Sequence, residues 1–119
     1  MLDPSGEYRF LSNDYFVDGV SNFRDMYITV ENGQLVHSSL NHVPIAGVFD
    51  DTTGKIDFTL VGAPGVPGLT QHYTGFVILT KQNLVRSMAG TFTRYEITAS
   101  GTFHVQFAER GWFAISVHP

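Results

Sequence analysis

The stretch FRDMYITVENGQLVHSSL, residues 23–40, decides the fold class of this chain. Two alternating runs of apolar and polar residues flank Asn32-Gly33, which is the strongest short-range signal for a two-residue β-hairpin. Both turn residues tolerate the positive φ that such a turn requires. The turn also fixes the pairing of the two strands, because it places Glu31 opposite Gln34. The sequence therefore predicts an antiparallel hairpin with a defined register.

This register gives the second strand of the hairpin an unusual face. Counting back from the turn places Ile28 opposite His37 and Met26 opposite Ser39, so two polar residues share a face with apolar ones. One interpretation is a core histidine bonded to a serine or a backbone carbonyl, since buried polar groups generally find partners. The other is that this face lines a cavity in which His37 and Ser39 orient a ligand.

Short alternating runs separated by turn signals continue along the chain, and none keeps a helical period over three turns. This spacing is typical of an antiparallel barrel or sandwich. We therefore expect an all-β fold, a single antiparallel up-and-down β-barrel of about eight or nine strands in one domain, residues 1–119, with a two-sheet β-sandwich as the alternative. The expected strands are Gly6–Leu11, Phe23–Glu31, Gln34–Leu40, Val43–Phe49, Lys55–Val61, Gln71–Thr80, Val85–Ile97, Gly101–Phe107 and Gly111–Val117.

Two glycine-containing segments are expected to interrupt the strands. Gly62–Gly68 holds two prolines and three glycines, which predicts a loop at the barrel rim or a lid over its mouth. Glu109-Arg110-Gly111 predicts a three-residue hairpin loop. Both would lie at the ends of the barrel.

The strand Val85–Ile97 bears on whether the barrel is hollow. One face carries Val85, Ser87, Ala89, Thr91, Thr93 and Tyr95, and the other carries Arg86, Met88, Gly90, Phe92, Arg94 and Glu96. Three charges on the second face favour the small, mildly polar face as the inner one, which would leave room for a ligand. The alternative is that Met88 and Phe92 point inward and the threonines face solvent.

Composition excludes several classes of function. With seven Lys and Arg against 11 Asp and Glu, the net charge is −4, so we expect no nucleic-acid partner. The chain has no cysteine and therefore no disulfide or thiolate metal site. Its five histidines form no H-x-H pair, and no nucleotide or cofactor motif occurs, so we expect neither a metal nor a cofactor.

The same sequence features bear on location and membranes. No run approaches the roughly 18 apolar residues of a membrane span, so no membrane partner is expected. The N-terminus MLDPSGEYRF lacks the pattern of a signal peptide. Together with the absence of cysteine, this favours the cytoplasm.

Several short motifs resemble the calycin-like (lipocalin-like) barrels, in particular the avidin-like branch. They follow the family's order along the chain and are SGEYRFLSN (residues 5–13), PIAG (44–47), GFVIL (75–79), MAGTF (88–92) and TFHVQF (102–107). The resemblance implies an eight-stranded meander with a small-molecule pocket at one mouth and homo-oligomers, dimers or tetramers, formed through strand faces. By position it makes Tyr8, Ser12, Asn13 and Trp112 pocket residues. Avidin-like proteins enclose biotin with several tryptophans, whereas this chain has only Trp112 and carries Leu79 at another tryptophan position, so biotin is not the expected ligand.

Three classes of function remain open from the sequence. The leading hypothesis is a barrel that binds a small, mostly apolar molecule, with ligand contacts from His37, Ser39, Tyr8, Asn13, Tyr73, Thr91, Thr93, Tyr95 and Trp112. The second is a cofactor-free cyclase or isomerase that encloses its substrate in the same cavity. The third is a protein-interaction module with a filled core that uses the face of Tyr27 and Val36.

Overall fold

The computed structural model describes residues 2–12, 23–63, 66–80, 82, 84–97, 100–101 and 103–117. Every regular element in these ranges is a β-strand, which agrees with the all-β expectation. The strands are β1 (Gly6–Ser12), β2 (Arg24–Ile28), β3 (Val30–Glu31), β4 (Gln34–Leu35), β5 (Ser38–Leu40), β6 (Val43–Phe49), β7 (Lys55–Ala63), β8 (Val66–Leu79), β9 (Val85–Ile97) and β10 (Phe103–Ser116).

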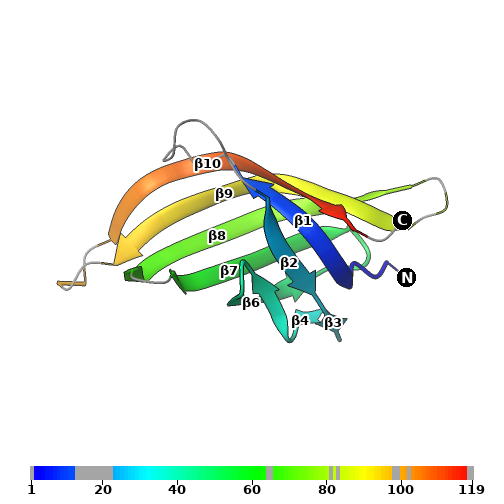
Figure 1. Ribbon diagram of the computed structural model, residues 1–119, viewed down its shortest axis with the longest axis horizontal. Helices are drawn as coiled ribbons and strands as arrows, with labels where there is room; N and C mark the ends of the chain where they lie inside the picture. Colours follow the sequence, from blue (N-terminus) through cyan, green and yellow to red (C-terminus); the bar gives the residue numbers. More distant parts are fainter. Residues whose placement is uncertain are drawn as a thin grey trace.

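Eight of these strands close into an antiparallel up-and-down barrel. The hydrogen-bonded order runs from β6 through β5, β2, β1, β10, β9 and β8 to β7, and pairing of β6 with β7 closes the ring. The small hairpin β3–β4 lies outside the ring and contacts β6 through the pair Gln34–Val48. Figure 1 shows β7 to β10 as a long curved wall that β1 and β2 cross. The barrel prediction is confirmed, and the sandwich alternative is not.

The Asn32-Gly33 turn forms as the sequence predicts. Both residues have positive φ, 52° and 75°, and Glu31 pairs with Gln34. Because Asn and Gly accept this conformation at little cost, the local sequence suffices to specify the turn.

The predicted register is wrong beyond this turn. Tyr27, and not Met26, pairs with Ser39, so the strand after the turn is displaced by one residue. The extra residue is His37, whose φ of 47° places it in a bulge, exposed to solvent. The pairing of Ile28 with His37 that the hairpin predicts therefore does not form.

The hydroxyl of Ser38 explains this displacement. The backbone amide of Thr29 donates to Ser38 Oγ at 3.0 Å, and Ser38 Oγ lies 3.0 Å from the carbonyl oxygen of Val36. A side-chain oxygen thus replaces a backbone partner in the ladder. The consequence is that Ser38 is buried, while Ser39 lies on the outward-facing side beside Tyr27.

Two predicted loops are wrong as well. The expected hairpin loop at Glu109–Gly111 lies within the continuous strand β10, where pairing with β9 shifts and Glu109 has a φ of 55°, so the glycine-containing segment makes a bulge and not a turn. The expected loop Gly62–Gly68 is strand at both ends, because β7 continues to Ala63 and β8 starts at Val66, its partner. Residues 64–65 lie outside the described ranges.

Large side chains fill the middle of the barrel. Phe58 and Phe92 stack on opposite sides of Tyr73, with ring centroids 4.8 and 4.9 Å away. Phe10 stacks on Trp112 at 5.6 Å. All five side chains are buried, as are the aliphatic and small residues around them: Met26, Ile28, Ile56, Leu60, Met88 and Ala114.

The inner face of β9 is the one that carries Met88 and Phe92, so the predicted orientation of this strand is wrong. Both side chains are fully buried, whereas Thr91 is exposed and Ser87 is half-buried. The charges that suggested an outer face sit near the two ends of the strand, at Arg86, Arg94 and Glu96. Since β9 is longer than the apolar core is deep, charged residues at its ends reach the barrel mouths on the inner side.

Candidate binding groove

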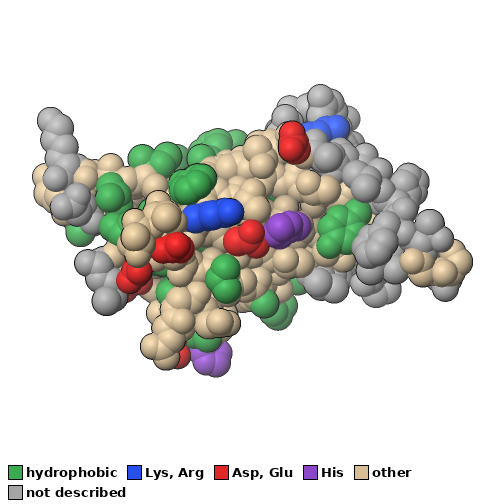
Figure 2. All heavy atoms as spheres, turned by 180° about the vertical axis from the view of Figure 1, so that it is seen from behind, with side chains coloured by type: hydrophobic (Ala, Val, Ile, Leu, Met, Phe, Trp, Pro, Cys, Tyr) green, Lys and Arg blue, Asp and Glu red, His purple; other side chains and the backbone are tan. Residues whose placement is uncertain are grey.

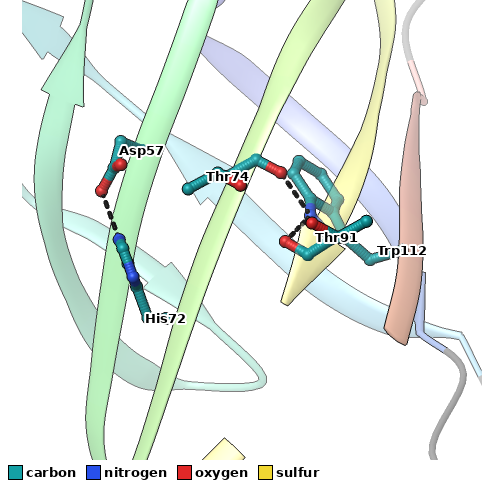
Figure 3. Close-up of polar contacts among 5 residues, drawn as sticks. All are labelled: Asp57, His72, Thr74, Thr91 and Trp112. Carbon is teal, nitrogen blue, oxygen red and sulfur yellow. Dashed lines mark hydrogen bonds and ion pairs between the residues drawn. The ribbon is translucent and has the colours of Figure 1, made fainter. Parts of the chain in front are cut away.

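Three of the predicted ligand residues lie inside the barrel. Tyr8, Tyr73 and Trp112 are buried, and each uses its polar atom within the protein. The Tyr8 hydroxyl donates to the carbonyl oxygen of Pro4 at 2.5 Å, and the Tyr73 hydroxyl donates to Gln71 Oε1 at 3.0 Å. Trp112 Nε1 donates to the carbonyl oxygens of Thr74 and Thr91 at 3.2 and 3.1 Å (Figure 3).

The other predicted residues do not join these three. His37 and Thr91 are exposed, and Ser39, Thr93 and Tyr95 are half-buried on the outer side of the wall. Asn13 lies outside the described residues, so its proposed contact is not placed. The described residues of the predicted set therefore divide between a filled interior and the outer surface.

The N-terminal segment closes one end of the barrel. Pro4 is buried beneath Tyr8, and the amide of Val30 donates to Ser5 Oγ at 3.0 Å. Leu2 packs against the core, near the turn that contains Gly54. Residues 2–5 thus cross from β1 towards the β6–β7 turn.

A groove of about 630 Å³ lies at this closed end. It is bounded by the N-terminal segment, the β3–β4 hairpin and the β6–β7 turn, three segments that are distant in sequence. Its lining residues are Leu2, Asp3, Val30, Asn32, Gly33, Phe49, Asp50 and Asp51. The volume lies within the range of small-molecule sites.

The groove combines apolar contacts with negative charge. Phe49 is buried, and Leu2 and Val30 are packed against the core. Asp50 accepts hydrogen bonds from the amides of Thr52 and Thr53, which lower the pKa of its carboxyl below the usual 3.8. Asp50 is therefore ionised at neutral pH and holds the turn that carries Asp51.

Sequence reasoning missed this groove for an identifiable reason. Asp50 and Asp51 show only the signature of a turn, and Asn32-Gly33 shows only that of a hairpin. Their juxtaposition depends on how the β3–β4 hairpin packs against β6, where the amide of Phe49 donates to the carbonyl oxygen of Gly33 at 2.8 Å. The acidic pair beside a hydrophobic residue, Phe49-Asp50-Asp51, is the one local signal that could have pointed to it.

A second polar arrangement lies on the outer wall. His72 Nε2 and Asp57 Oδ1 are 2.7 Å apart (Figure 3), and both side chains are partly exposed. The strand register puts Thr59 and Thr93 on either side of His72. Figure 2 shows a histidine, an acidic side chain and a basic one in a row across this face. This pair ties β7 to β8 on the outer surface of the barrel.

The described residues contain no cluster of three or more His, Cys, Asp or Glu side chains that could hold a metal ion. They also contain no helix long and apolar enough to cross a membrane. No protein-family model matches the chain, and the comparisons with curated proteins and with solved structures returned no match. The eight-stranded closed barrel is compatible with the calycin-like architecture, and the likeness is limited to this arrangement of strands.

Proposed function

We propose that this chain binds a small molecule with an apolar body and a cationic group, in the groove at the closed end of the barrel. The observation that carries the proposal is the groove itself, about 630 Å³ in volume, with carboxylates on two of its three bounding segments. The barrel centre is filled by aromatic side chains, so the mouth is the better place for a ligand.

The apolar side of the groove supplies the contact area for such a ligand. Leu2, Val30 and Phe49 line it, and all three also pack against the buried core. Side chains held from behind by the core present a preformed surface, so little ordering accompanies binding. An alkyl or aryl group of the ligand fits this surface.

The polar side selects the sign of the ligand's charge. Asp3, Asp50 and Asp51 line the groove, and no Lys or Arg is among its lining residues. Asp50 is ionised at neutral pH, and the amide hydrogen bonds that lower its pKa keep it ionised under more acidic conditions. An ammonium group is attracted here and a carboxylate is repelled, although an exposed pair of this kind contributes only about 0.2–1 kcal/mol.

Three matched probes test the proposal: octylammonium, octanol and octanoate. Binding is followed by the backbone amide shifts of Gly33 and Asp51, which lie on opposite sides of the groove. We expect octylammonium to bind up to about fivefold more tightly than octanol, because one exposed ion pair adds at most about 1 kcal/mol. Octanoate should bind least.

Two variants locate the site and one controls for net charge. Asp51→Asn should reduce the preference for octylammonium over octanol, and Val30→Arg should weaken binding of both by obstructing the apolar side of the groove. Glu109→Gln removes the same charge from an exposed position on β10 and should leave binding unchanged. Tighter binding of octanoate than of octylammonium would contradict the proposal. An equal loss of octylammonium affinity in Asp51→Asn and Glu109→Gln would contradict it as well.

A further inference from the structure

An apolar patch covers part of the outer wall formed by β8, β9 and β10. Phe76 and Ile78 on β8 are 53% and 52% exposed, and Phe113 and Ile115 on β10 are 36% and 49% exposed. The strand register aligns them in two rows, Phe76–Ala89–Phe113 and Ile78–Ser87–Ile115. The patch is therefore continuous over three neighbouring strands.

The relief of this patch is that of two ridges with a valley between them. Large side chains on β8 and β10 form the ridges, and Ser87 and Ala89 on β9 form the valley. Phe23 extends the ridge of β10, because its ring meets that of Phe113 edge to face at 6.4 Å. A surface of this form is complementary to another ridge of the same spacing.

Among the residues that the structure describes, the charged groups near the patch lie at its rim. On one side Arg9 pairs with Asp25 at 2.9 Å, and Arg9 is the strand partner of Ile115. On the other side Lys55 is the strand partner of Phe76. The Asp57–His72 contact lies further along the same two strands, β7 and β8. In Figure 2 hydrophobic side chains lie above this charged row, on the side of β8 to β10. An apolar centre inside a polar rim is the anatomy of a protein interface.

We propose that this wall is a dimer interface, and that its partner is a second copy of the same chain. A two-fold axis parallel to the strands, between β9 and β10, would place the ridge of Phe113 and Ile115 of each copy in the valley of Ser87 and Ala89 of the other. The contact is then isologous, with each copy supplying one ridge and one valley. The patch thus provides its own complementary surface.

The patch supplies about three quarters of the area that each partner of a stable complex buries. Covering the exposed parts of its aromatic and aliphatic side chains removes on the order of 600 Å² from water in each copy. The largest patch on a typical monomer is about 300–600 Å², whereas a stable complex buries about 800 Å² per partner. Contacts from the rim, with Arg9 and Lys55, supply the remainder.

The experiment measures mass in solution by sedimentation equilibrium, from about 1 to 100 μM, the range of moderate affinity. The wild-type chain should reach twice the monomer mass of 13.2 kDa. Ile115→Glu on the ridge and Ser87→Arg in the valley should each weaken the dimer at least tenfold. The matched control is Val48→Glu, because Val48 is also 50% exposed but lies on β6, outside the patch.

The near-ultraviolet circular dichroism of buried Trp112 reports whether each variant keeps its fold. A native signal with a monomer mass in both patch variants, and a dimer in Val48→Glu, is the expected result. A wild-type chain that stays monomeric at 100 μM, or a dimer lost only in Val48→Glu, would overturn the proposal. A monomer that co-sediments with neutral phosphatidylcholine vesicles would also overturn it, and would assign the patch to a lipid surface.

Discussion

Gly75 leaves the space that the indole of Trp112 occupies against β8 and β9. A Cβ atom added at Gly75 would lie 2.4 Å from the carbonyl oxygen of Ala89 and 2.7 Å from Trp112 Cζ2. Gly75→Ala should therefore lower the free energy of unfolding by about 2–4 kcal/mol, through overpacking and strained indole hydrogen bonds. Urea unfolding measures this effect. Gly111→Ala is the matched control, since an added Cβ there meets nothing within 4 Å, and an equal loss in both variants would contradict the account.

The bulge between β4 and β5 makes a second prediction, at the scale of the element. His37 has a φ of 47°, which costs most L-residues about 1–2 kcal/mol and a β-branched residue more. His37→Gly should raise the unfolding midpoint slightly, and His37→Val should lower stability by about 1 kcal/mol. Ser39→Val is the control, because Ser39 is in β5 and its strand position suits a β-branched residue. Equal effects of valine at the two positions would show that the bulge is not strained.

The same hairpin shows how much of the fold the sequence could predict. Asn32-Gly33 and the alternation around it are local signals, so the turn, the first pairs and the all-β class follow from the residues alone. The displacement at His37 comes from the hydroxyl of Ser38, a preference that alternation does not contain. The prediction for β9 took the face that carries Arg94 and Glu96 as the outer one, because charged residues usually face solvent. These two residues lie on the inner face, near the end of the strand, where they reach a barrel mouth.

The candidate groove could be predicted only in part. Each of its turns has a local signature, but the groove exists because the β3–β4 hairpin packs against β6 and the N-terminal segment reaches the β6–β7 turn. No local pattern specifies such a meeting of three segments. Tyr8 and Trp112 were named as pocket residues through the family resemblance, and both are buried, as is Tyr73. Neither the resemblance nor a face pattern reveals whether an interior is filled.

At the scale of the whole molecule, the buried Tyr8 at the closed end of the barrel should make the free energy of unfolding fall at alkaline pH. Burial, and then the charge of Asp3, raises the pKa of Tyr8 from 10.0 to about 12, while Arg86 lowers it slightly. Above pH 10 the unfolded chain loses this proton while the folded chain keeps it, so the stabilisation is present below pH 10 and is lost as the pH rises towards 12. The total loss is roughly 3 kcal/mol, since one pKa unit corresponds to about 1.4 kcal/mol.

Urea unfolding at pH 9, 10 and 11, followed by Trp112 fluorescence, measures this loss. Tyr8→Phe lacks the titrating hydroxyl, so its stability should fall less steeply over this interval than that of the wild-type chain. Tyr27→Phe is the comparison variant. The hydrogen bond to Glu7 at 3.2 Å also raises the pKa of Tyr27, but this hydroxyl is open to solvent, so the slope should change less than in Tyr8→Phe. Parallel curves for the wild type and Tyr8→Phe would mean that the closed end admits water to the Tyr8 hydroxyl.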